Sequence, residues 1–471
     1  MEFIKTQKGR EMLVLDGFSF VRERKGVNGK LIWKCSQYSD SRCLARCHTI
    51  DGVLVKNIGH HNHVPDAAKI AARKTVEDIK LRAATTQEAG HQIVASTAAV
   101  VTAAVAAQLP SVNGLKQTIR RERREKEIPL PNPENLQDLI IPDAYKTTTS
   151  GENFLSYDSG PGQNRFLIFA TQRNLDRMVQ CENWYADGTF KSSPPLFQQI
   201  YTIHALRYSD VIPTVFILMS DRSTTSYVRV FTELKRLQPA LDPKTVMTDF
   251  EQAAILAWTT VFPNATQRGC FFHLSQCLWR HLQQTPDLQQ RYTTDAEFAL
   301  AIRQLAALAF VPPNDVSSAF DDLMETHFYQ IHSTILRPLV NYFEDTWIGR
   351  PGRRGRGRNA PMFSHALWNC YDASLDDLPK TNNSVEGWHR GFSQLLGAHH
   401  PSIWKFIKGI KKEESMNEMK LEQYVAGQQP PPGKRVYKDT AERIKTIVAD
   451  YGLRPTTDYL RGIAHNLRLQ I

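Results

Sequence analysis

Three acidic residues in the middle of the 471-residue chain lie in settings that could bring carboxylates together. Asp187 ends the aromatic run NWYADGTF, Asp249 ends the apolar run KTVMTDFE, and Glu386 lies in the helical pattern NNSVEGWHRGF. Magnesium and manganese prefer oxygen ligands. Two such ions about 3.5 to 4 Å apart can activate a water and stabilise the leaving oxygen of a phosphodiester. Convergence of the three carboxylates would therefore predict a two-ion site for Mg²⁺ or Mn²⁺.

Each of these acids also has an ordinary structural explanation. Asp187 precedes Gly188 and could begin a turn. Asp249 and Gln252 have the spacing of a capping box, so Asp249 could cap the helix that follows it. Glu386 could be a solvated position on a helix. The local patterns alone do not distinguish metal ligands from these alternatives.

A second candidate metal site lies near the N-terminus. Cys35, Cys43, His61 and His63 supply two thiols and two imidazoles, the last two from the segment GHHNHVPD. Zinc binds such ligands tetrahedrally, and residues i and i+2 of a strand face the same side. The set predicts a Zn²⁺ site that stabilises a small strand-rich unit. Cys47 could replace Cys43, and ordinary surface histidines with buried cysteines are the alternative.

Three further residues lie between the acids or just after them in the sequence. Cys270 and His273 form a Cys-x-x-His pair between Asp249 and Glu386, and His389 lies one helical turn after Glu386. Two ligands do not make a zinc site, so we expect Cys270 and His273 to brace the fold or to position DNA. His389 could contact a phosphate, steady Glu386 or pack in the core.

Two arginine-rich segments could contact a phosphate backbone. KQTIRRERREK could be a helical DNA contact, a nuclear-entry signal or a salt-bridged exposed helix. RPGRRGRGRN is a glycine-spaced loop that could hold DNA near Glu386, or a disordered solubilising loop. The predicted DNA-contacting residues are Arg120, Arg121, Arg123, Arg124, Arg350, Arg353, Arg354, Arg356 and Arg358.

Strand and helix patterns between residues 162 and 262 indicate the elements that must position the acids. The strand-like runs are QNRFLIFAT, NWYADGTF, FQQIYTIHALRY, VIPTVFILMS and KTVMTDFE. TSYVRVFTELKRL and EQAAILAWTTVF have apolar residues at helical spacing. This order predicts a mixed sheet with helices packed on it. Residues 274–346 are predicted to be entirely helical.

The composition is that of a globular chain with polyanion-binding ends. The net charge is +10, with the positive excess in residues 1–140 and 399–471. We expect no membrane span and no signal peptide, because no apolar run is long enough and the N-terminus lacks an apolar core. Seven cysteines in a chain of this length predict no disulfide framework, so a reducing compartment is expected.

Residues 1–66 resemble the FLYWCH-type zinc finger, of the wider group that includes WRKY and GCM DNA-binding domains. The likeness is carried by Gly17, Phe18, Trp33, Cys35, Cys43, Ala45, Arg46 and the HNH at 61–63. The resemblance implies a zinc-held β-sheet that binds DNA.

Residues 180–400 resemble the catalytic domain of Mutator-like (MULE) transposases. The matching segments are DGTF at 187–190, TDFEQA at 248–253, GCFFHLSQ at 269–276, WN at 368–369 and TNNSVEGWH at 381–389. The resemblance implies a DDE enzyme with an RNase H-like fold, interrupted by an all-helical insertion. Its catalytic and Mg²⁺-binding acids would be Asp187, Asp249 and Glu386.

The predicted fold class is a multidomain α+β protein. Its expected parts are a finger at 1–66, a basic helical DNA-binding region at 67–127 and a linker at 128–160. The RNase H-like core would span 161–273 and 361–400, with a helical insertion at 274–360 and a C-terminal helical region at 401–471.

The function implied is that of a nuclear cut-and-paste transposase. It would bind terminal inverted repeats of double-stranded DNA, hydrolyse phosphodiesters at the element ends and join the 3′ hydroxyls to target DNA. A homodimer or larger assembly is expected because two ends must meet. The alternatives are a catalytically silent regulator derived from such an enzyme, and a structure-specific nuclease.

Overall fold

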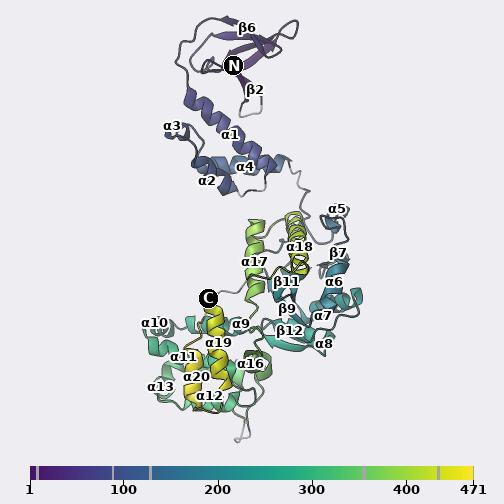
Figure 1. Ribbon diagram of the computed structural model, residues 1–471, viewed down its shortest axis with the longest axis vertical. Coiled ribbons are helices and arrows are strands. Elements are labelled where there is room, and N and C mark those ends of the chain that lie inside the picture. Colours follow the sequence, from purple (N-terminus) through teal and green to yellow (C-terminus); the bar gives the residue numbers. More distant parts are fainter. Residues whose placement is uncertain are drawn as a thin grey trace. The chain divides into compact units, whose positions relative to one another are not determined.

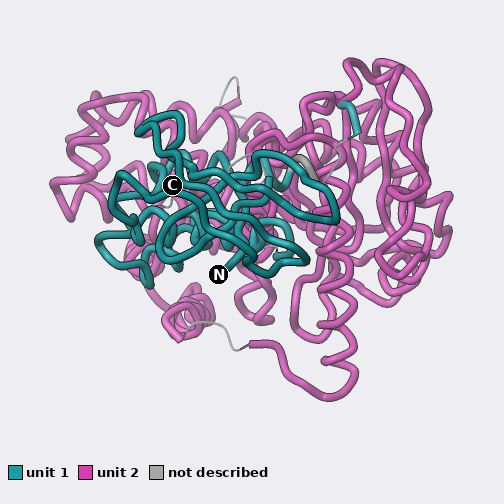
Figure 2. Tube along the Cα trace, turned by 90° about the horizontal axis from the view of Figure 1, so that it is seen from above, with its two compact units in different colours: residues 1–131 teal, residues 132–471 magenta. Residues whose placement is uncertain are grey.

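The computed structural model describes residues 1–6, 10–86, 88, 90–126, 130–352, 357–431 and 435–469. The chain forms two compact units, residues 1–131 and 132–471 (Figure 2). None of the helices in the described ranges is long and apolar enough to cross a membrane.

The first unit begins with a six-stranded antiparallel sheet whose strands follow one another in sequence order. Asp16 and Gly17 join β2 to β3 with positive φ, as a two-residue hairpin turn requires, and Asp51 and Gly52 do the same between β5 and β6. Trp33 is fully buried at the centre of the sheet. The strands are β1 (Glu2–Lys5), β2 (Glu11–Leu15), β3 (Phe18–Lys25), β4 (Leu31–Cys35), β5 (Arg46–Ile50) and β6 (Val53–Ile58).

Helices follow this sheet, as the sequence predicts for residues 67–127. They are α1 (Ala67–Thr85), α2 (Gly90–Ala98), α3 (Ala103–Ala106) and α4 (Val112–Lys126). The side chain of Asp66 accepts a hydrogen bond from the Lys69 N–H, which caps α1. Ile79, Ile93 and Ile119 are buried where α1, α2 and α4 pack together. The three helices therefore have a small core of their own.

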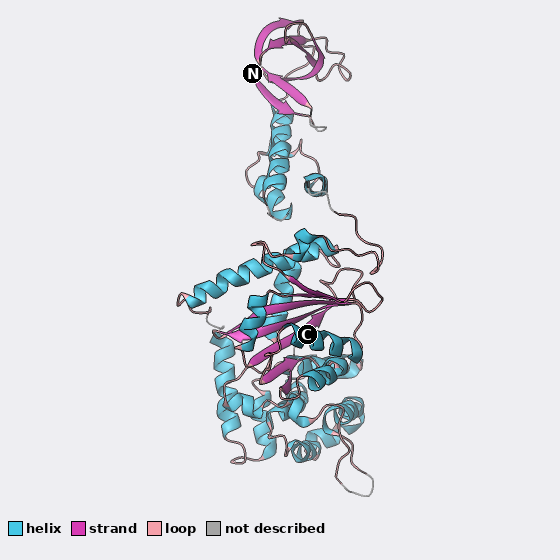
Figure 3. Cartoon of the chain, turned by 90° about the vertical axis from the view of Figure 1, so that its right-hand side faces the viewer, coloured by secondary structure: helices cyan, strands magenta, loops and turns pink. Residues whose placement is uncertain are grey.

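The second unit contains a seven-stranded mixed sheet (Figure 3). Its order is β13-β12-β9-β10-β11-β8-β7. β12 pairs in parallel with β9 and β13, whereas the remaining pairs are antiparallel. The strands are β7 (Leu155–Asp158), β8 (Phe166–Phe169), β9 (Asn183–Thr189), β10 (Gln199–Arg207), β11 (Asp210–Met219), β12 (Thr245–Thr248) and β13 (Thr266–Gly269).

Helices cover both faces of this sheet, so its strands are almost continuously apolar. One face packs against α6 (Gln172–Val179), α7 (Thr224–Leu237) and α8 (Gln252–Val261). The other packs against α17 (Asn383–Leu396) and α18 (Ile403–Val425). A short helix, α5 (Asp143–Lys146), precedes β7, which is the first strand of this sheet in sequence order. The prediction of a sheet-containing finger followed by a mixed α/β remainder is confirmed.

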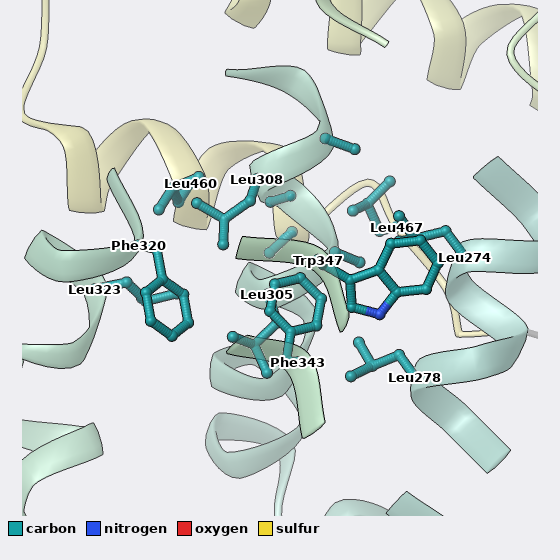
Figure 4. Close-up of a cluster of buried hydrophobic side chains, with 14 of the residues drawn as sticks. Leu274, Leu278, Leu305, Leu308, Phe320, Leu323, Phe343, Trp347, Leu460 and Leu467 are labelled. Carbon is teal, nitrogen blue, oxygen red and sulfur yellow. The ribbon is translucent and has the colours of Figure 1, made fainter. Parts of the chain in front are cut away.

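A block of helices forms a separate core beside the sheet (Figures 1 and 4). Leu278 of α9, Phe320 of α12, Phe343 of α14 and Leu460 of α20 point toward one another in it. The helices are α9 (Phe271–Gln283), α10 (Pro286–Thr294), α11 (Ala296–Ala307), α12 (Val316–Met324), α13 (His327–Ile331), α14 (Ser333–Phe343), α15 (His365–Trp368), α16 (Tyr371–Leu375), α19 (Arg435–Ala449) and α20 (Thr456–Ala464).

The segment 401–471, expected as one C-terminal region, is divided between these two parts. α18 packs on the sheet, whereas α19 and α20 bury Val448, Tyr459 and Ile463 in the helical block. The Tyr459 hydroxyl donates to the carbonyl of Phe310. These apolar faces are therefore covered within the chain.

Candidate functional site

Two of the predicted acids lie side by side at one edge of the sheet. Asp187 is in β9, an interior strand of the sheet, and Asp249 directly follows the neighbouring strand β12. These strands are parallel, with Met247 opposite Tyr185, so the register continued by two residues brings Asp249 level with Asp187. Side chains at matched positions of neighbouring strands share a face. Asp187 is inside a strand, so the turn considered for it is not formed.

The third acid reaches this edge from α17. Asn382, the residue before this helix, is fully buried and bound to Cys270. The thiol of Cys270 donates to Asn382 Oδ1 at 2.8 Å, and the Asn382 N–H lies 3.3 Å from the Cys270 sulfur. Cys270 therefore contacts the residue that precedes the helix carrying Glu386.

The pKa of Asp187 responds to the charges of the other two acids. Burial raises the pKa of Asp187 well above its usual range, and the charges of Asp249 and Glu386 raise it further. Burial also raises the pKa of Asp249, and it raises that of Glu386 to about 7. The N–H of Gly188 donates to Asp187 Oδ1 at 2.9 Å, which opposes the rise at Asp187. Such clustering of negative charge is unfavourable without a cation.

These residues fit a hard divalent cation. All three candidate ligands are carboxylates, and Glu386 Oε1 is buried without a hydrogen-bond partner among the described residues. Asp249 Oδ1 accepts a 3.2 Å bond from the Glu251 N–H. The capping-box explanation for Asp249 is wrong, because α8 begins at Gln252 with Glu251 as its N-cap.

Glu251 and Arg222 were not predicted as site residues, although both adjoin the acids. Arg222 Nε donates to Glu251 Oε1 at 3.0 Å, and the Tyr227 hydroxyl donates to Glu251 Oε2 at 2.9 Å. Arg222 lowers the pKa of Asp249, whereas Glu251 raises that of Asp187. Glu251 could have been noticed from its position two residues after Asp249, but Arg222 lies in no motif.

Both histidines singled out in the sequence contact the acids. His273 Nε2 lies 3.6 Å from Glu386 Oε1, and His389 Nε2 lies 3.6 Å from Asp187 Oδ2. The sequence suggested that His389 could steady Glu386. The carboxylate it faces is instead that of Asp187.

The four predicted zinc ligands gather at the end of the first unit's sheet. Their ligand atoms all lie within 4.8 Å of one another. Cys35 Sγ is 3.2 Å from His63 Nε2, Cys43 Sγ is 3.4 Å from His61 Nδ1, and the two imidazole nitrogens are 3.3 Å apart. Ligands about 2.0 to 2.3 Å from a tetrahedral zinc are separated by about 3.3 to 3.8 Å. The cluster therefore has the dimensions and donor types of a Zn²⁺ site.

Cys47 is not part of this cluster. It is fully buried beside Trp33 and Phe20, and burial raises the pKa of its thiol to about 12. The ring of Phe18 stacks on His61 with centroids 3.7 Å apart, which holds that imidazole in place.

The predicted DNA-contacting arginines are placed in different surroundings. Arg120 and Arg121 are exposed on α4, whereas Arg123 donates to the backbone carbonyls of Ala83 and Glu88. Arg350 pairs with Glu344 and Asp345, and Arg358 with Glu344 and Asp321. The last two arginines thus stabilise the base of their loop. Arg353, Arg354, Arg356 and the side chain of Arg124 lie outside the described residues.

The raised pKa of Glu386 predicts a stability change with pH. The unfolded carboxyl titrates near 4.5 and the folded one near 7, so the folded chain holds the extra proton between these values. The free energy of unfolding therefore loses this contribution as pH rises from about 4.5 to 7. Without divalent metal, Glu386→Gln should match the parent in Tm near pH 4.5 and exceed it by a few degrees at pH 7.

Calorimetry across this pH range measures the difference between the two proteins. The matched control is Glu325→Gln, which changes an exposed carboxylate at the end of α12. The same pH response in both variants would contradict the environment described for Glu386.

Comparisons with known proteins identify two domains. Residues 3–63 match the FLYWCH zinc finger domain and residues 183–277 match the MULE transposase domain. The resemblance drawn from the motifs is therefore confirmed, and the chain carries these two domains in this order. The second match includes Asp187, Asp249, Cys270 and His273.

Individual relatives cover less of the chain. FLYWCH-type zinc finger-containing protein 1 of Homo sapiens is 34% identical over 79 residues, which is 17% of this chain and 11% of that protein. The protein of the same name from Mus musculus is 36% identical over 86 residues, which is 17% of this chain and 12% of that protein. The chain thus spans about a tenth of the length of these relatives.

A solved structure, the Drosophila P element transposase strand transfer complex, aligns with 84% of this chain and 92% of its own chain. The sequence identity is 12% and the TM-score is 0.23. At this TM-score the similarity supports no conclusion about fold or activity.

Proposed function

We propose that this chain, with its FLYWCH zinc finger domain ahead of a MULE transposase domain, is a cut-and-paste DNA transposase. The observation that carries the proposal is that Asp187 of β9 feels the charges of both Asp249, which directly follows the parallel strand β12, and Glu386 of α17. The seven-stranded sheet with helices on both faces would be the RNase H-like core, and the helical block its insertion.

In this proposal the three acids together hold two Mg²⁺ or Mn²⁺ ions. Asp187 and Asp249 would bridge or hold the ions, and Glu386 would complete the second position. When bound, the ions supply the activation of the attacking oxygen and stabilisation of the leaving oxygen. Burial of Asp187 keeps its carboxylate weakly solvated, which strengthens its attraction to a cation.

The first unit would hold the DNA ends. The finger, with Zn²⁺ held by Cys35, Cys43, His61 and His63, and the helices up to residue 127 would bind terminal inverted repeats. Lysines and arginines outnumber acids in this part of the chain, which favours binding to the phosphate backbone. We propose that the protein acts in the nucleus, on double-stranded DNA, as a homodimer or larger assembly.

The test is cleavage of a labelled duplex carrying the repeat end, with Mg²⁺ or Mn²⁺. The parent should nick at the repeat end and join the new 3′ hydroxyl to a second duplex, whereas Asp249→Asn should bind the duplex without cutting. Binding without cleavage by the parent would favour a silent, transposase-derived regulator. Cleavage without joining would favour a structure-specific nuclease.

A further inference from the structure

Two helices place a histidine beside each of two acids in the candidate site. Cys270 is the N-cap of α9, and its thiol donates to Asn382, the N-cap of α17. His273 lies in the first turn of α9 and faces Glu386, which lies in the first turn of α17. The starts of the two helices are therefore in contact, and the histidine of one faces the acid of the other.

His389 lies beside Asp187, as His273 lies beside Glu386. It lies three residues after Glu386 on α17, so both side chains face the same edge. Thr202 is directly opposite Asp187 on β10, and its hydroxyl lies 3.5 Å from His389 Nε2 and 3.0 Å from His204 Nε2. His389 faces Asp187 Oδ2, whereas the Gly188 N–H donates to Asp187 Oδ1.

The surroundings of the ring nitrogens indicate which nitrogen of each imidazole carries the N–H proton. Nδ1 of His273 and Nδ1 of His389 are buried without a hydrogen-bond partner among the described residues. A neutral imidazole carries one N–H, and it is stabilised where an acceptor is available. In both rings the nitrogen facing an acceptor is Nε2, 3.6 Å from a carboxylate oxygen.

We propose that His273 and His389 are positioning residues: their Nε2 atoms, each 3.6 Å from a carboxylate oxygen of Glu386 or Asp187, move to hydrogen-bond distance and orient these carboxylates when they hold a divalent cation. The inference rests on the proposed function only in naming the acids as metal ligands. Carboxylate ligands are commonly held by hydrogen bonds of this kind, and loss of such a partner typically weakens metal affinity 10- to 100-fold.

The test measures Mn²⁺ binding to the zinc-loaded full chain by electron paramagnetic resonance of free Mn²⁺. The Mn²⁺ binding that remains in Asp249→Asn measures binding away from the three acids. His273→Ala and His389→Ala should each weaken binding at the acids by about 10- to 100-fold. His273→Gln and His389→Gln, which keep an N–H donor, should recover most of the affinity. His281→Ala is the matched control, because His281 lies on α9 but stacks on Tyr342.

Thermal melts without divalent metal separate positioning from folding. Parent-like affinity in both alanine variants would overturn the inference, as would equal losses in the alanine and glutamine variants. Losses that track a fall in Tm would also overturn it, because they indicate a structural role. If the parent binds Mn²⁺ but cuts no DNA, the proposed function fails while this inference is still judged by the histidine variants. Absence of Mn²⁺ binding that depends on Asp249 overturns both.

Discussion

Removal of zinc should unfold the six-stranded sheet and leave residues 132–471 folded. The sheet buries few large side chains, chiefly Leu13, Phe20 and Trp33, and a unit of about 60 residues has a net stability of only a few kcal/mol. Binding of structural zinc contributes roughly 10 to 16 kcal/mol in small zinc-finger peptides. Loss of the ion therefore exceeds what the remaining contacts supply, whereas the second unit has large cores of its own.

Hydrogen exchange with mass spectrometry resolves the two units within the full chain. After treatment with a zinc chelator, peptides from residues 1–66 should lose protection and peptides from 132–471 should keep it. Repeat-DNA binding should fall at the same chelator concentration. Retained protection in the finger would show that the hydrophobic core suffices without the ion.

Two cysteine variants test which thiols hold the zinc. Cys35→Ser should lose the bound ion, because it removes a donor from the four-atom cluster. Cys47→Ala should retain one zinc per chain with a modest loss of stability, because Cys47 packs beside Trp33 away from the cluster. Elemental analysis measures the zinc content of both variants. Loss of zinc in Cys47→Ala would contradict the exclusion of Cys47 from the zinc ligands.

The elements that carry the acids could be predicted because their sequences are locally unambiguous. β8 to β12 are apolar runs, and both Asp187 and Asp249 occur where such a run ends. β13 was missed because its four residues, TQRG, contain no apolar run, and it is a strand only because it pairs in parallel with β12. A strand defined by its neighbour has no local signal.

Contacts between distant segments were less predictable than the elements themselves. Helical spacing put Glu386 and His389 on one face of α17, but it could not say that His389 would meet Asp187. Arg350 and Arg358 were predicted from composition to bind DNA, yet their acidic partners, which include Asp321, precede the loop in the folded helical block. Charge runs do not reveal which of their members pair within the chain.

Replacement of Asp187 by asparagine should abolish DNA cleavage and, without divalent metal, raise stability. Loss of a metal-holding carboxylate should remove several kcal/mol of transition-state stabilisation, which corresponds to at least about 1,000-fold in cleavage rate. The same carboxylate is destabilising at neutral pH in the metal-free chain, because its pKa is raised by burial and by Asp249 and Glu386. Asparagine retains the shape and removes the charge.

The two effects together distinguish a metal site from an ordinary buried acid. Without metal, Asp187→Asn should melt above the parent at pH 7, and addition of Mg²⁺ should raise the Tm of the parent more than that of the variant. Asp242→Asn, which changes an exposed aspartate before β12, is the matched control and should alter neither quantity. A variant that loses stability would mean that the Asp187 carboxylate is held by favourable contacts within the fold. It would then have no unbalanced charge for a cation to neutralise, and the electrostatic basis for placing the ions at this edge would be lost.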